Sequence, residues 1–273
     1  MKIAITGKGG VGKTTLSAVL SHLYSADGRT VIAVDADPDA NLAAAFGLDK
    51  EQTKDLRPIA EMGQLIEERT GARPGSMGGV FKLNPRVDDI PQACSVKVGG
   101  GVPPHTSGSI RLLVMGKSKE AASGCYCPEN VFLKRLLKHL VTERDDVVIV
   151  DMEAGIEHLT RGTAEGVDAF IVVVEPGRRS IQTALVVRDM SKTLGVENVF
   201  VVAGKVRSPA DVEFITGLLE GMNYAGSVGF SQAVVEADIK GIPPYENAPE
   251  TVKDIKKIKD FIESCIKRPG TIR

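Results

Sequence analysis

The sequence lacks the features that mark secreted, membrane-spanning and nucleic-acid-coating proteins. Its 273 residues include only four cysteines, without a regular spacing, so they do not form a disulfide framework. No apolar run reaches the roughly 18 to 20 residues that span a bilayer, and the N-terminus has the pattern of a strand rather than of a signal peptide. The 34 basic and 35 acidic side chains nearly cancel, which argues against a dedicated DNA- or RNA-binding surface. We therefore expect a cytoplasmic protein that binds neither membrane nor nucleic acid.

What the chain does contain is the pattern of an α/β protein. Apolar residues make up 42% of it and charged residues 25%, which is typical of a globular protein with an ample core. Short β-branched segments alternate with amphipathic ones, so we predict a mostly parallel twisted sheet covered by helices on both faces. The wholly apolar segment 147–150 is expected to be a central strand. The predicted strands are 2–6, 30–35, 110–115, 146–151, 169–174, 199–203 and 227–230. The predicted helices are 13–26, 57–70, 128–141, 180–194, 209–220 and 247–267.

The domain organisation is expected to be simple. Glycine and proline interrupt any periodicity over 71–109, which indicates a loop insertion with one short hairpin. No linker separates two hydrophobic cores, so residues 1–273 are predicted to form a single domain. The last predicted helix has an apolar stripe at three- and four-residue spacing. Packing on the domain is the favoured explanation for this stripe, and membrane binding is the alternative.

A phosphate-binding motif follows the first predicted strand. Residues 7–15 read G-K-G-G-V-G-K-T-T and open a helix, which is the context that the G-x-x-x-x-G-K-[ST] motif requires. Backbone amides of the loop and the helix N-terminus would hold a polyphosphate, Lys13 would reach its β- and γ-phosphates, and Thr14 would ligate Mg²⁺. The predicted nucleotide-binding residues of this loop are Gly9, Gly10, Val11, Gly12, Lys13, Thr14 and Thr15.

The additional lysine at position 8 makes the loop similar to the deviant Walker A motif. The chain thus resembles the dimeric P-loop ATPases that include MinD, ParA and the nitrogenase iron protein. In that family the first lysine reaches the phosphates bound by the partner subunit. The resemblance therefore implies ATP hydrolysis to ADP and phosphate, a homodimer, and a role in trans for Lys8 as a catalytic residue beside Lys13.

Aspartates stand at the ends of two predicted strands. Asp35 and Asp37 follow the second strand, where a carboxylate would face the γ-phosphate, and Asp151 closes the apolar strand 147–150. Solvated turn residues are the alternative. The resemblance implies that Asp37 activates the attacking water as a third catalytic residue, that Asp35 and Asp151 lie at the Mg²⁺ with Thr14, and that Gly155 is the glycine of the second switch region.

A C-x-C pair, Cys125 and Cys127, separates this chain from most of these ATPases. Two thiolates are too few for a tetrahedral metal site, but two chains meeting at a two-fold axis would supply four, enough for Zn²⁺ or Ni²⁺. Inert buried thiols and a redox-sensing pair are the alternatives. Cys94 and Cys265 are expected to be structural, and no histidine is assigned to a metal.

Four motifs in order make the chain similar to one branch of the family. K-G-G-V-G-K-T-T, D-A-D-P-D, C-Y-C-P-E-N and D-M-E-A-G-I-E-H-L-T-R-G resemble the CooC-type carbon monoxide dehydrogenase maturation ATPases. This resemblance implies an ATP-driven nickel-insertion factor with carbon monoxide dehydrogenase as its client, and a homodimer that depends on nucleotide, metal or both. Its cofactors would be ATP or ADP and Mg²⁺, with Ni²⁺ or Zn²⁺ held by the cysteines at the dimer interface.

One position departs from the family pattern. The segment after the strand 199–203 should read N-K-V, with an asparagine that recognises adenine, but here Gly204 precedes Lys205. We expect the base to be bound by backbone groups near Lys205 and Pro243, since glycine permits close backbone approach, or by another residue.

Two other functions compete with nickel insertion. A MinD- or ParA-like positioning ATPase would act on membrane or DNA, and the cysteine pair weighs against it. An electron carrier like the nitrogenase iron protein would need a cysteine just after Asp151, where the chain has Met152 and Glu153.

Overall fold

The structure is a computed structural model of the chain. It describes residues 1–37, 39–75, 80–99, 108–116, 128–142, 146–153 and 166–266. These residues form an eight-stranded sheet in the order β3-β4-β2-β5-β1-β6-β7-β8. All neighbouring strands are parallel except the edge pair of β3 and β4. The strands are β1 Lys2–Thr6, β2 Thr30–Ala36, β3 Val96–Lys97, β4 Ser109–Val114, β5 Val147–Met152, β6 Ala169–Val174, β7 Val199–Val206 and β8 Asn223–Gly229.

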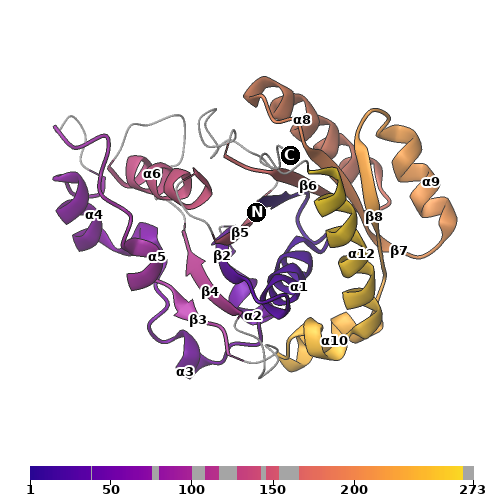
Figure 1. Cartoon of the computed structure of the whole chain (residues 1–273), viewed down its shortest axis with the longest axis horizontal. Coiled ribbons are helices and arrows are strands. Elements are labelled where there is room, and N and C mark those ends of the chain that lie inside the picture. Colours follow the sequence, from indigo (N-terminus) through magenta and orange to yellow (C-terminus); the bar gives the residue numbers. More distant parts are fainter. Residues whose placement is uncertain are drawn as a thin grey trace, which may run out of the picture.

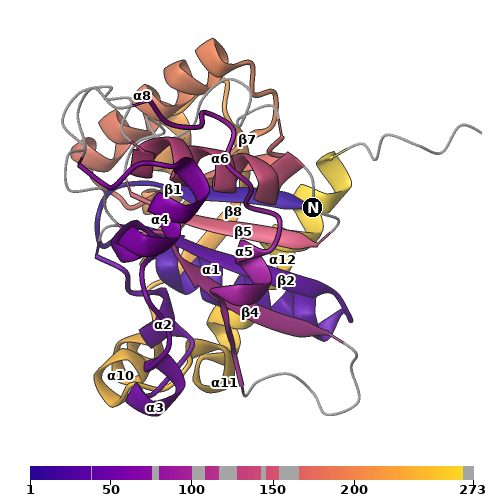
Figure 2. The same cartoon turned by 90° about the vertical axis from the view of Figure 1, so that its left-hand side faces the viewer.

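Helices cover both faces of the sheet, so the predicted α/β fold is confirmed (Figures 1 and 2). One core lies under η1, α4, α5, α6, α8 and α9, and the second under α1, α2 and α12. The strand β5 lies between β1 and β2 and is wholly buried, as its continuous apolar run predicts. The helices are α1 Lys13–Ala26, α2 Leu42–Ala45, α3 Lys50–Thr53, η1 Ile59–Glu61, α4 Gly63–Thr70, α5 Ile90–Ala93, α6 Pro128–Thr142, α8 Arg178–Leu194, α9 Pro209–Leu218, α10 Gln232–Lys240, α11 Pro244–Asn247 and α12 Pro249–Cys265.

Several predicted elements have different bounds. The predicted helix 247–267 is α12, which begins at Pro249 because Ala248 precedes a proline and leaves the helical region at φ −128° and ψ 68°. The predicted helix 57–70 is divided at Met62. The strand β8 begins at Asn223, four residues before the prediction, and α10 was not predicted at all. Within 71–109, α5 and β3 are ordered elements, and β3 pairs with β4 as an antiparallel edge.

The C-terminal helix packs on the sheet. Ile255, Ile258 and Ile262 are buried in the core that α1 shares, so the packing explanation for the apolar stripe is confirmed. Cys94 packs partly buried against the first core, whereas Cys265, also expected to be structural, is exposed at the end of this helix. No helix within the described ranges is both long and apolar enough to cross a bilayer.

Candidate functional site

The loop between β1 and α1 has a backbone that only glycine can supply. Gly7 has φ +146°, and a Cβ there would lie 2.4 Å from the carbonyl oxygen of Val173. Gly12 precedes α1 in the left-handed region at φ +102°. No side chain in the described part of the chain caps α1, so the amides of its first turn remain for an anion. The loop therefore has the backbone of a phosphate site.

Two lysines of the loop point to different partners. Lys13 is only 5% exposed, and its Nζ lies 3.4 Å from the carbonyl oxygen of Lys8 and 3.7 Å from Oδ2 of Asp37. The ammonium of Lys8 is instead 40% exposed and donates to Oε1 of Glu175 at 3.0 Å. The structure thus places Lys13 inside the loop with Asp37 beside it, and holds Lys8 against the end of β6.

The predicted aspartates meet at the carboxyl ends of two neighbouring strands. Asp35 of β2 and Asp151 of β5 are register partners, and both are buried. Asp35 accepts hydrogen bonds from the amides of Leu42 at 2.8 Å and Asp37 at 3.3 Å. Burial nevertheless raises the pKa of Asp35 to about 6, because it disfavours the charged form more than these bonds favour it.

Asp151 is the least satisfied polar group of the site. Neither of its carboxylate oxygens has a hydrogen-bond partner within the described residues. Burial raises the pKa of Asp151 to about 7; the nearby Thr14 hydroxyl opposes this shift, and the charge of Asp35 adds to it. An orphaned buried carboxylate beside a hydroxyl has the hard oxygen donors that Mg²⁺ takes. Thr14, Asp35 and Asp151 therefore fit the predicted Mg²⁺ site.

No larger metal cluster accompanies these groups. Over the ranges that the structure describes, no three histidine, cysteine, aspartate or glutamate residues converge on one point. The predicted metal ligands Cys125 and Cys127 and the predicted switch glycine Gly155 lie outside the described residues.

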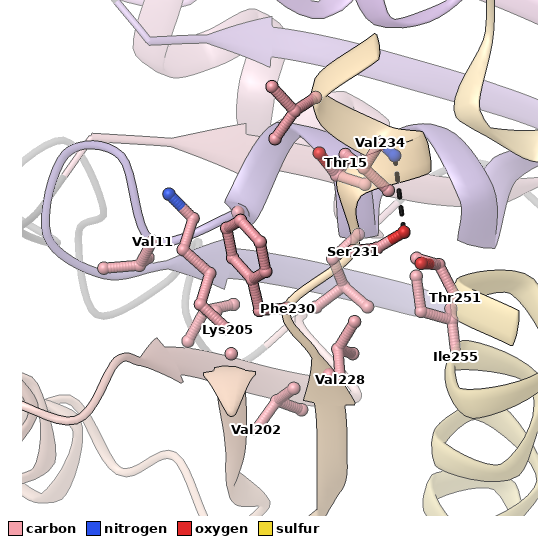
Figure 3. A pocket seen from close by; sticks show the side chains of 16 residues that line it. Val11, Thr15, Val202, Lys205, Val228, Phe230, Ser231, Val234, Thr251 and Ile255 are labelled. Atoms are coloured by element: carbon pink, nitrogen blue, oxygen red, sulfur yellow. Dashed lines mark hydrogen bonds between the residues drawn. The ribbon is translucent and has the colours of Figure 1, made fainter. Parts of the chain in front are cut away.

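A cavity of about 100 Å³ opens beside the phosphate loop (Figure 3). This is several times the volume of one water molecule, which leaves room for part of a ligand. Lys205 and Gly204 line it, and a Cβ on Gly204 would lie 2.7 Å from the carbonyl oxygen of Val11. Gly204 therefore lets β7 approach the phosphate loop itself. The lining residues are Val11, Gly12, Thr15, Leu16, Val173, Val202, Gly204, Lys205, Val228, Gly229, Phe230, Ser231, Val234, Val235, Thr251 and Ile255.

The expected base contact at Pro243 stays a prediction. Pro243 is not one of the described residues that line this cavity; its ring packs on Gly47, so close that a Cβ there would lie 2.6 Å from the proline Cδ. The wall is formed instead by Phe230, Ser231 and α10, which sequence reasoning missed. The signals that mark α10 are Ser231, whose hydroxyl accepts from the amide of Val234 at 3.3 Å, and Gly241 in the left-handed region behind it.

A buried aromatic cluster packs α1 against neighbouring segments of the chain. The ring of His22 stacks on Tyr245 at 4.6 Å between centroids and meets Phe46 edge-on at 5.5 Å. Neither ring nitrogen of His22 has a hydrogen-bond partner within the described residues. Burial lowers the pKa of His22 to about 4, so the ring is neutral at physiological pH and acts as a packing group.

Comparison with known proteins gives one consistent family. Residues 2–245 match the family model of the CobQ/CobB/MinD/ParA nucleotide binding domain. The chain is 45% identical over 249 residues to the carbon monoxide dehydrogenase accessory protein CooC of Rhodospirillum rubrum, which covers 91% of each chain. It is 42% identical to an uncharacterized ATP-binding protein of Methanocaldococcus jannaschii, over 96% of this chain and 97% of that one. The solved structure of the MinD cell division protein of Aquifex aeolicus matches with a TM-score of 0.66 over 100% of both chains, at 18% identity.

Proposed function

The chain belongs to the CobQ/CobB/MinD/ParA family of nucleotide-binding ATPases, and from this we propose that it is a homodimeric metallochaperone that uses ATP hydrolysis to help insert nickel into the active-site cluster of carbon monoxide dehydrogenase. The observation that carries the proposal is the near-full-length similarity to CooC, combined with a phosphate loop that has the second lysine, Lys8. The resemblance to the CooC-type ATPases that the motifs indicate is confirmed by that similarity.

ATP hydrolysis would proceed by positioning and by neutralisation of phosphate charge. The first-turn amides of α1 and the buried ammonium of Lys13 would bind the β- and γ-phosphates. Mg²⁺, held by Thr14 and Asp151, would supply further positive charge to these phosphates. Asp37, whose carboxylate lies 3.7 Å from Lys13, would orient the attacking water.

In the dimer, the side chain of Lys8 would turn away from its own subunit toward the nucleotide of the partner subunit. In the single chain its ammonium is paired with Glu175, so it contributes no charge to the phosphate loop. Reaching a nucleotide in the partner subunit requires that this ion pair break. ATP would therefore favour the dimer by offering Lys8 a more highly charged partner than Glu175.

The metal would be held by Cys125 and Cys127 of both subunits. Four thiolates at a two-fold axis suit Ni²⁺ or Zn²⁺, and closing or opening the dimer would change their geometry. ATP can promote metal transfer only if the ATP-bound and ADP-bound dimers differ in their affinity for the metal.

The decisive experiment counts bound metal per dimer. The purified protein is sized by sedimentation with and without a non-hydrolysable ATP analogue and Ni²⁺, and the metal is measured in each species. We expect one ion per dimer, and its loss in the Cys125→Ser/Cys127→Ser double variant with ATP binding retained. Cys265→Ser is the matched control, because that thiol is exposed at the end of α12. Full metal retention in the double variant would remove the metal role.

The client is tested separately in cells. We expect carbon monoxide dehydrogenase produced with the Lys13→Ala variant to contain less nickel than the enzyme produced with the unchanged chain, at equal protein yield. Equal nickel content would refute the maturation role. ATP-dependent sedimentation with lipid vesicles or plasmid DNA would instead support a positioning ATPase.

A further inference from the structure

Phe230 is an aromatic side chain with no place in either hydrophobic core. It follows β8, is 44% exposed, and its amide donates to the carbonyl oxygen of Val206 at 2.8 Å, which fixes its backbone against β7. Burial in the core therefore does not explain a large ring at this position. Its location beside the phosphate loop suggests that it binds something there.

The ring of Phe230 lies between two cavities. It lines the cavity beside the phosphate loop and also a second one, which Arg207 and Glu175 line. The guanidinium carbon of Arg207 lies 4.6 Å from the ring centroid, and Arg207 lines the second cavity but not the cavity beside the phosphate loop. Arg207 thus lies over the ring, and the same ring lines the loop cavity, where Figure 3 shows Phe230 beside Lys205 and Ser231.

The loop cavity favours a flat apolar group over a polar one. Half of its lining residues are aliphatic, and its polar side chains are Thr15, Lys205, Ser231 and Thr251. The Ser231 hydroxyl already caps α10. None of the described lining residues carries the amide or carboxylate that pairs with the edge of a base. The lining residues therefore suit stacking against the flat face of a ligand ring better than hydrogen bonding to its edge.

We propose that Phe230 binds the base of the nucleotide by stacking on the ring face turned toward the loop cavity, and that Arg207 is the positioning residue that holds this ring. The inference rests on the proposed nucleotide-binding function and adds to it a specific base contact. Stacking on an aromatic ring tolerates any base, because each base has a π-face. It would supply affinity for the base, but not the selection of adenine that the asparagine of the family pattern provides.

The absence of tryptophan from the chain provides a direct probe. In Phe230→Trp the single indole would stack on the base, so ATP should quench its fluorescence, while inorganic triphosphate should not. The matched control is Phe214→Trp, at an aromatic side chain on α9 that is 37% exposed and does not line the cavity. Its fluorescence should respond to neither ligand.

Affinities test the same contact in the absence of a fluorophore. Phe230→Ala should weaken ATP binding about 5- to 150-fold, the range that loss of one base–aromatic stack gives, and leave the affinity for inorganic triphosphate unchanged. Arg207→Ala should reduce the ratio of ATP affinity to triphosphate affinity, but by less than Phe230→Ala does, and Arg207→Lys should restore this ratio. Phe214→Ala should change neither affinity.

The possible results separate the two proposals. Unchanged ATP affinity in Phe230→Ala, or equal quenching of Phe230→Trp by ATP and triphosphate, would overturn base stacking and leave the ATPase proposal intact. Failure of the unchanged chain to bind either ligand would instead contradict the proposed function.

Discussion

Replacing Asp151 by asparagine should stabilise the ligand-free protein more at high pH than at low pH. The pKa of this buried carboxyl rises from 3.8 to about 7 on folding. Three pKa units at about 1.4 kcal/mol each make the ionised folded form about 4 kcal/mol less favourable once the pH exceeds 7. At pH 5 the folded carboxyl is protonated and the unfolded one is ionised, so the penalty is only about 1.5 kcal/mol.

The sign follows from the direction of the shift. Because the folded state binds a proton more tightly than the unfolded state, stability falls as the pH rises from about 4 to 7. Asparagine removes this dependence and adds a buried amide, whose cost of about 1 to 3 kcal/mol does not vary with pH. The effect of the substitution on the free energy of unfolding should therefore differ by about 2.5 kcal/mol between low and high pH, and this difference reports the ionisation of the Asp151 carboxylate alone.

The assay is urea unfolding in EDTA without nucleotide, at pH 5 and pH 8.5, for the unchanged chain and Asp151→Asn. Asp238→Asn is the control, because that carboxylate is exposed on α10. The effect of Asp151→Asn on the free energy of unfolding should be about 2.5 kcal/mol more favourable at pH 8.5. An effect equal at both pH values within 0.5 kcal/mol, or one equally present in Asp238→Asn, would refute the reasoning.

Three further changes test other parts of the structure. Glu175→Gln should strengthen ATP-dependent dimerisation about 2- to 30-fold, measured by sedimentation. Each subunit has one Lys8–Glu175 ion pair to break, and each pair contributes about 0.2 to 1 kcal/mol. Weaker dimerisation would contradict this. Gly204→Ala should lower ATP affinity at least tenfold by calorimetry, since its Cβ would meet a loop carbonyl at 2.7 Å, whereas Gly217→Ala has open space and should not. The lowered pKa of His22 makes protonation favour the unfolded chain, so the free energy of unfolding should fall by about 3 kcal/mol between pH 7 and pH 4. His22→Phe should remove this fall in a urea-unfolding series over the same pH range. The same fall in the variant would contradict this explanation.

The phosphate loop and the sheet could be predicted from the sequence because their signals are local. The loop of residues 7–15 is contiguous, and its glycines and lysine specify both its backbone and its charge. The strand β5 begins with four consecutive apolar residues, 147–150, a run that is typical of a strand buried on both faces. The pairing of Asp35 with Asp151 followed from placing both at strand ends, although the identical register became known only from the structure.

The cavity beside the loop could not be predicted in the same way. Its residues come from α1, β6, β7, β8, α10 and α12, and no spacing in the sequence indicates that they meet. Pro243, which we expected near the base, is not among the described residues that line this cavity; its ring packs on Gly47 in the turn before α11. The helix α10 has only nine residues, so its periodicity was too short to recognise without the caps at its ends.

The composition of this cavity also constrains when during synthesis the protein can bind its ligand. Val11 and Ile255 line the same space although 255 − 11 = 244 positions separate them in the chain. A nascent chain on the ribosome carries the phosphate loop early, but the cavity wall is incomplete until α12 has emerged and packed against α1. Such distant contacts form late and slowly in folding. The wall of the cavity is therefore complete only in a chain that includes α12.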